Sequence, residues 1–91
     1  VYQQIKLYQI YKFMKKIDDK IITALKKTFT KSKIPKKINN LKIGELKGWD
    51  SLGHVNLLLE IEKIFKLKFD SQIFLNLDSI KKIKKELIKL S

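Results

Sequence analysis

The chain has 91 residues, of which 44% are hydrophobic and 33% charged, and its formal net charge is +12. This length suits one small domain, and the hydrophobic share is too high for a disordered chain. Because cysteine is absent, disulfides and thiolate metal ligands are excluded. We see neither an apolar run of the roughly 18–20 residues that span a bilayer nor the order of a signal peptide. We therefore expect a cytoplasmic monomer without a transmembrane segment.

The first predicted helix covers about residues 15–30, where Ile17, Ile21, Leu25 and Phe29 recur at helical spacing. The same spacing continues more weakly upstream to Tyr2. Since the chain begins with valine and Met14 is a candidate start, we treat residues 1–13 as an N-terminal extension of uncertain origin. Residues 14–91 then form the domain.

Residues 31–50 hold the single proline and two of the three glycines, which predicts a long loop. A second helix follows from Ser51 to about Phe65, with Asp50 as its N-cap. A short third helix is expected near residues 71–75, and a last helix from Leu77 or Asp78 to Leu90. No strand pattern of period two is seen. The sequence therefore predicts an all-α bundle of three long helices and one short third helix, with a long loop between helices one and two.

Ser51 begins the second predicted helix and allows three interpretations. In the first, it is a structural residue whose hydroxyl bonds to a first-turn N–H, as serine near a helix start commonly does. In the second, it is a catalytic nucleophile with Asp50 and His54. Against this, Trp49 replaces the first glycine of the G-x-S-x-G pattern, and a lone histidine at this spacing is more often solvated. In the third, it carries a phosphate ester, which the N–H groups and the partial positive charge of a helix start favour.

The stretch WDSLGHVNLLLEIEKIFKLKF, residues 49–69, resembles the phosphopantetheine-attachment region of acyl carrier proteins and peptidyl carrier domains. There, Asp-Ser-Leu opens a hydrophobic second helix whose Glu-Glu-x-Phe-like end leads into a short turn. The order of long helix, long loop, serine-bearing helix, short helix and final helix extends the resemblance over about residues 14–90. The matching positions are Asp50, Ser51, Leu52, Val55, Leu58, Leu59, Glu62 and Phe65.

The resemblance implies a four-helix acyl-carrier-like bundle that performs no chemistry itself. Ser51 is expected to receive 4′-phosphopantetheine from a phosphopantetheinyl transferase, with Asp50 and Leu52 in transferase recognition. The thiol of the arm then carries acyl or aminoacyl groups as thioesters for loading and accepting enzymes. The expected partner surface consists of Gly53, His54, Val55, Asn56 and Leu59, although core packing is the plainer role for Leu52, Val55 and Leu59.

The charge departs from fatty-acid carriers, which are generally acidic. Together with Trp49 before the motif and Gly53-His54 after it, this favours a free-standing carrier of a specialised pathway, such as aminoacyl transfer or cell-surface polysaccharide biosynthesis. The alternative is a small basic helical module that binds nucleic acid or an anionic membrane surface through the lysines of residues 81–89. All 21 basic residues are lysine, whereas specific readers of bases rely on arginine. We therefore expect no specific nucleic-acid recognition.

Overall fold

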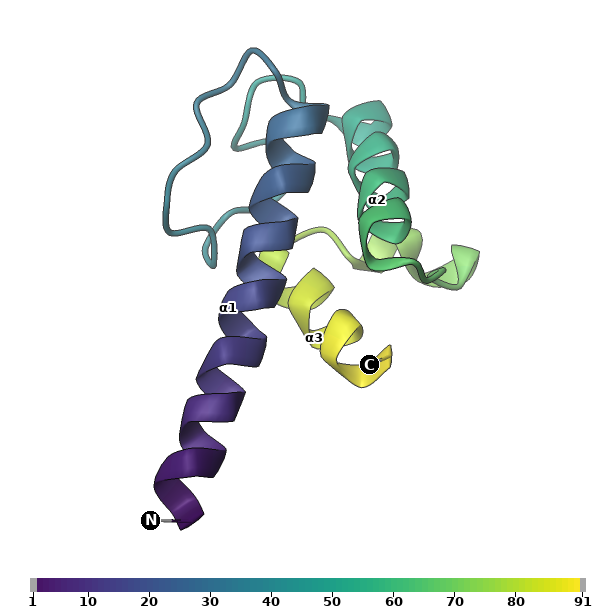
Figure 1. The fold of residues 1–91 in the computed structure, drawn as a ribbon. Helices are drawn as coiled ribbons and strands as arrows, with labels where there is room; N and C mark the ends of the chain where they lie inside the picture. The colour runs from purple at the N-terminus through teal and green to yellow at the C-terminus, as the bar shows by residue number, and fades with distance from the viewer. Residues whose placement is uncertain (1, 91) are drawn as a thin grey trace.

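The computed structural model describes residues 2–90, with side chains from residue 6 onward. Its elements are α1 (Tyr2–Thr28), α2 (Ser51–Phe65), the 3₁₀ helix η1 (Ser71–Asn76) and α3 (Ile80–Leu90) (Figure 1). Within the described range no residue belongs to a strand, so the expectation of an all-α chain is confirmed. No helix in this range has the length and hydropathy that a membrane-spanning segment needs.

Helix α1 has two different environments along its length. Its second half packs against α2, with Ile21, Ala24 and Leu25 fully buried, whereas its first half extends beyond the rest of the molecule (Figure 1). Leu7 and Tyr11 on that first half are 64% and 63% exposed. The helix runs without a break through residues 13 and 14, so the division of the chain at this point stays a prediction.

Residues 31–50 form the expected long loop, which is fixed to the body at several separate points. Ile38 and Trp49 are buried in the core, and Ser32 donates a hydrogen bond to the Lys47 carbonyl at 3.1 Å. An isolated antiparallel bridge pairs Lys42 with Ser79. In it the Ile43 N–H donates to the Asp78 carbonyl and the Ile80 N–H to the Leu41 carbonyl, both at 2.9 Å.

This bridge explains why α3 begins later than the sequence predicts. We expected a start at Leu77 or Asp78, but the backbone around Asp78 and Ser79 is paired with the loop, so helical bonding begins after it. Ser79 then acts as a cap, since its hydroxyl oxygen accepts a hydrogen bond from the Lys82 N–H at 3.3 Å.

Helix α2 has the predicted bounds, Ser51 to Phe65. It ends at Lys66, whose left-handed backbone (φ 56°) is a common helix-terminating conformation. Beyond it, the Glu62 carboxylate accepts a hydrogen bond from the Phe69 N–H at 2.7 Å and holds the chain close to α2. The short third helix is confirmed, and it has 3₁₀ geometry with Asp70 as its N-cap.

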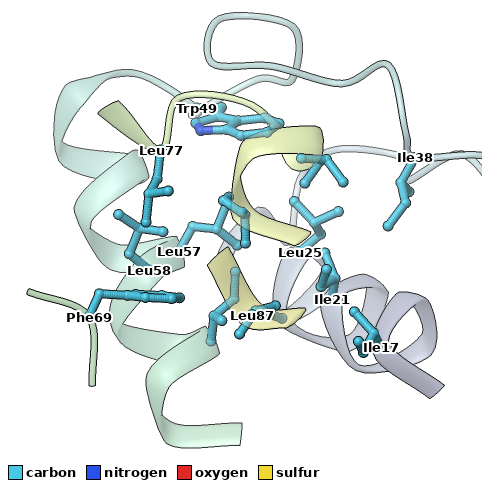
Figure 2. Close-up of a cluster of buried hydrophobic side chains, with 14 of the residues drawn as sticks. Ile17, Ile21, Leu25, Ile38, Trp49, Leu57, Leu58, Phe69, Leu77 and Leu87 are labelled. Carbon is cyan, nitrogen blue, oxygen red and sulfur yellow. The ribbon is translucent and has the colours of Figure 1, made fainter. Parts of the chain in front are cut away.

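The core lies between α1, α2 and α3 and is closed at one end by Trp49 (Figure 2). Burial of a leucine or isoleucine side chain contributes about 1.5–3 kcal/mol, so the fully buried side chains dominate the stability. The helices contribute Ile21, Ala24, Leu25, Leu57, Leu58, Ile61, Ile80, Ile83 and Leu87.

Candidate functional site

Asp50 caps α2, as the sequence predicts. Its backbone is extended, and its carboxylate accepts a hydrogen bond from the Gly53 N–H at 2.8 Å. Its carbonyl accepts the first helical bond, from the His54 N–H at 2.8 Å. Because Asp50 satisfies the first turn, the capping role considered for Ser51 is already filled.

Ser51 is the first residue of α2 and is exposed. Its hydroxyl forms no hydrogen bond with any part of the chain that the structure describes. It borders a shallow hollow of about 460 Å³, whose other walls include Ile43, Leu46 and Trp49. A reagent in solvent can therefore reach the hydroxyl without displacing any contact.

A second hollow, of about 420 Å³, opens on the other side of Asp50, between the end of α1 and the start of α2. Lys31 and Lys47 line it, and both are exposed. Asp50 lines the same hollow, so its carboxylate offsets one of the two lysine charges. The free N–H groups of the helix start add to the remaining preference for an anion.

Gly53 allows the loop to cross the first turn of α2 at very short range. A Cβ added to Gly53 would lie 1.9 Å from the Gly48 carbonyl oxygen and 3.0 Å from the Phe29 ring. Gly48 itself has a positive φ of 89°, which side-chain-bearing residues rarely adopt. The two glycines therefore set the path of the chain on either side of Trp49, Asp50 and Ser51.

His54 is buried, not solvated as we expected. Its side chain is 3% exposed and lies against Trp49, which is 1% exposed. The Trp49 Nε1–H donates a hydrogen bond to His54 Nδ1 at 3.0 Å, so the neutral ring carries its proton on Nε2. Phe29 stacks on Trp49 with the ring centres 5.6 Å apart. This stack joins the residue that follows α1 to the loop and to the first turn of α2.

Burial lowers the pKa of His54 below its ordinary value of 6.5, and the carbonyls of Phe74 and Leu77 and the charge of Asp78 oppose this only in part. A buried ring whose Nδ1 is already bonded to Trp49 is poorly placed as a general base. The catalytic interpretation of Ser51 is correspondingly weakened. Among residues 2–90 no group of three or more potential metal ligands occurs.

The predicted partner surface is only partly exposed. Gly53 and His54 are buried: the first faces the loop backbone and the second faces Trp49, and the partner role given to them stays a prediction. Asn56 is exposed. Three apolar side chains assigned mainly to core packing instead face solvent: Leu52 is 71%, Val55 38% and Leu59 51% exposed.

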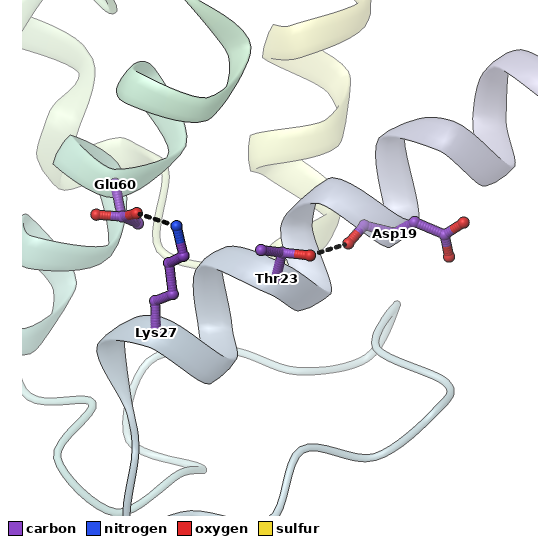
Figure 3. Close-up of polar contacts among 4 residues, drawn as sticks. All are labelled: Asp19, Thr23, Lys27 and Glu60. Atoms are coloured by element: carbon purple, nitrogen blue, oxygen red, sulfur yellow. Dashed lines mark hydrogen bonds and ion pairs between the residues drawn. The ribbon is translucent and has the colours of Figure 1, made fainter.

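Leu52, Val55, Asn56 and Leu59 form one stripe, because residues three, four and seven apart share a helix face. We call these four residues the α2 stripe. Next to it, Lys27 of α1 pairs with Glu60 of α2 at 3.7 Å (Figure 3). One turn earlier on α1, the Thr23 hydroxyl donates a hydrogen bond to the Asp19 carbonyl at 3.0 Å. The α2 stripe therefore starts beside Ser51 and runs along the outer side of α2.

The lysine face predicted on the last helix is partly used within the fold. Lys84 is bonded to Asp18 of α1 and to Asn39 of the loop, each at 2.7 Å, and its side chain is 12% exposed. Lys82 pairs with Asp78 at 3.0 Å. These contacts tie α3 to its neighbours and leave fewer free ammonium groups for binding an anionic surface.

No protein-family model, curated protein or solved structure matches the chain. The interpretation of the site therefore rests on its own residues. Sequence reasoning predicted the Asp50 cap, the helix start at Ser51 and an outward-facing Asn56, but it missed the hydrogen bond between Trp49 and His54. One signal in the sequence pointed to this bond. Trp49 directly precedes the cap of the helix, and His54 follows it within the first turn, so a donor and an acceptor lie close together.

Proposed function

We propose that this protein is a carrier that bears acyl or aminoacyl groups as thioesters on a 4′-phosphopantetheine arm attached to Ser51. The observation that supports this most is that two different residues cap α2 and present a free hydroxyl at its start. Asp50 performs the capping, while the Ser51 hydroxyl is exposed and unbonded within the described chain. Because its hydroxyl is not needed for capping, Ser51 is available for esterification.

The surroundings of Ser51 are compatible with a phosphodiester. The free N–H groups and the positive end of the helix dipole favour a negative charge at the first residue of α2. Lys31 and Lys47 line the adjacent hollow and outnumber Asp50, the acidic residue that also lines it. When attached, the arm supplies the thiol that this chain lacks, since the sequence contains no cysteine.

The order of elements supports the same proposal, because a long helix, a long loop, a serine-bearing helix, a short helix and a final helix occur in the order of acyl carrier bundles. On this proposal the α2 stripe is the docking surface for the transferase and for enzymes that load and collect the cargo. An exposed leucine directly after the modified serine, as at Leu52, suits recognition of a partner more than stability. The carrier itself catalyses no step.

The test is intact-mass spectrometry after incubation with coenzyme A, magnesium and a broad-specificity phosphopantetheinyl transferase. We expect the mass of one phosphopantetheine to be added to the wild-type chain and not to Ser51→Ala. The chain offers a matched control: Ser71 is also exposed and also follows an aspartate cap, Asp70, at the start of η1. Ser71→Ala should be modified like the wild type.

Two results would contradict the proposal. One is the absence of any mass gain in a sample that circular dichroism shows to be folded, with more than one transferase. The other is a gain that survives in Ser51→Ala. Either would leave Ser51 as an ordinary first-turn serine.

A further inference from the structure

A groove of about 350 Å³ lies where the middle of α1, the end of α2 and the last turns of α3 meet. Its walls include Phe13, Ile17, Phe65, Leu87 and Leu90. Ile17 and Leu87 belong to the core, whereas Phe13 and Leu90 are 42% and 46% exposed. The apolar interior is therefore continued outward to solvent at this corner, and the groove offers an apolar floor to a ligand.

The rim of the groove is positively charged. Lys16, Lys20 and Lys66 line it together with the apolar walls, and none of the described lining side chains is acidic. The ammonium of Lys20 lies 5.2 Å from the centre of the Phe65 ring. Within the described chain, the ammonium groups of Lys16 and Lys66 form neither an ion pair nor a hydrogen bond. These two cations are free to bind an anion at the mouth of the groove.

The size of the groove selects among possible occupants. A helix with its side chains is about 10–12 Å across and rises 5.4 Å per turn, so a single turn occupies roughly 400–600 Å³. This exceeds the groove volume of about 350 Å³, which is in the lower part of the range for small-molecule sites. A second copy of the chain is also disfavoured, because each copy has a net charge of +12 and would repel the other.

We propose that this groove binds an anionic amphiphile with a single hydrocarbon chain, such as a fatty acid. The chain lies on the apolar floor against Ile17, Phe65 and Leu87, and the carboxylate is held by Lys16, Lys20 and Lys66. Burial of the hydrocarbon supplies most of the affinity. The lysines select the sign of the headgroup, as charge complementarity does in other partly exposed sites.

This inference does not rest on the proposed function. Ser51 and Phe65 are the two ends of α2, and fourteen helical steps of 1.5 Å place them about 21 Å apart along the axis. The ligand is a free molecule, not cargo on an arm. Its binding should therefore be the same in Ser51→Ala as in the wild type, whether or not Ser51 is modified.

The test is isothermal titration calorimetry of the full chain with sodium octanoate, decanoate and dodecanoate below their micelle concentrations. We expect one saturable site, with affinity rising by up to about fourfold for each methylene that enters the groove. Dodecyltrimethylammonium, which has the same chain and the opposite charge, should bind at least tenfold more weakly. Chemical-shift mapping with dodecanoate should place the largest changes at Ile17, Phe65 and Leu87.

Matched variants separate the groove from general attraction to a basic protein. Leu90→Gln and Lys20→Gln should each weaken dodecanoate binding at least fivefold. Leu75 is 85% exposed and lies on η1, and Lys36 is exposed in the loop, so Leu75→Gln and Lys36→Gln should bind like the wild type. All four positions are outside the closed core, and circular dichroism checks that each variant is folded.

Three results would overturn the proposal. The first is binding at many sites that Leu90→Gln leaves unchanged, which would mean non-specific adsorption. The second is equal binding of dodecyltrimethylammonium. The third is a dimer in sedimentation equilibrium that Leu90→Gln dissociates, which would assign the groove to a second copy.

Discussion

Lowering the pH below 6.5 should destabilise this protein through one residue, His54. The folded protein keeps its imidazole neutral, because burial lowers its pKa below the ordinary 6.5 and Nδ1 accepts the Trp49 N–H at 3.0 Å. The unfolded chain binds a proton near pH 6.5 and the folded chain does not. Stability is therefore complete above pH 6.5 and decreases as the pH falls from 6.5 towards the lower folded pKa.

The size of the effect follows from one proton and one hydrogen bond. A single proton changes the free energy of unfolding by at most about 1.4 kcal/mol per pH unit in this window. Protonation of Nδ1 in the folded state would leave the buried Trp49 N–H without its acceptor, at a cost of about 1–3 kcal/mol. This cost opposes proton uptake by the folded chain and is not added to the slope. The Asp78 carboxylate, whose pKa the hydrogen bond from Lys82 lowers below its ordinary 3.8, titrates outside this window.

The measurement is urea denaturation of the wild type and His54→Asn at half-unit steps from pH 8 to pH 5. The asparagine Oδ1 can accept the indole N–H in place of Nδ1 and does not titrate. His54 is the only histidine, so we expect a sloping curve for the wild type and a lower but flat curve for the variant. A flat wild-type curve, or two parallel curves, would refute the assignment of a neutral, Trp-bonded His54.

Two further predictions concern the walls of the same site. Gly53→Ala places a methyl group 1.9 Å from the Gly48 oxygen and should cost at least about 2–3 kcal/mol in urea denaturation. Gly44→Ala, with a similar positive φ of 93° but open space around it, should cost less, and an equal loss would contradict the close approach. Lys27→Gln removes the pair with Glu60, which is mostly exposed on the lysine side, so the expected loss is below about 0.5 kcal/mol. A loss above 1 kcal/mol in the same assay would show that the pair contributes more than an exposed ion pair should.

The elements best predicted from the sequence are those whose ends are set by neighbouring residues. Asp50 supplies a cap immediately before an apolar periodic run, so α2 was predicted with its observed bounds. The start of α3 depends instead on Leu41 and Ile43, which are distant in sequence and bond the backbone on either side of Ser79. Local pattern contains no information on that pairing.

The site shows the same limit. Helix α2 is apolar on more than one side, so its pattern could not separate the inward Leu57 and Leu58 from the outward Leu52 and Leu59. The burial of His54 depends on the Trp49 indole, which belongs to the long loop and donates a hydrogen bond to the imidazole. A buried polar ring is costly unless it has such a hydrogen-bond partner. The sequence thus predicted that Ser51 begins its helix, which the structure bears out, whereas the inward and outward sides of that helix required the three-dimensional packing.

The backbone bridge between Lys42 and Ser79 also couples two regions in their local opening. The Ile43 and Ile80 amides each donate across it, so α3 cannot detach without releasing the segment that leads to Trp49. Partial unfolding of the C-terminal end is therefore transmitted to the turn that carries Ser51. We therefore expect the loop and α3 to exchange their amide hydrogens as one cooperative unit, so that Ser51 stays in place for as long as the last helix stays docked.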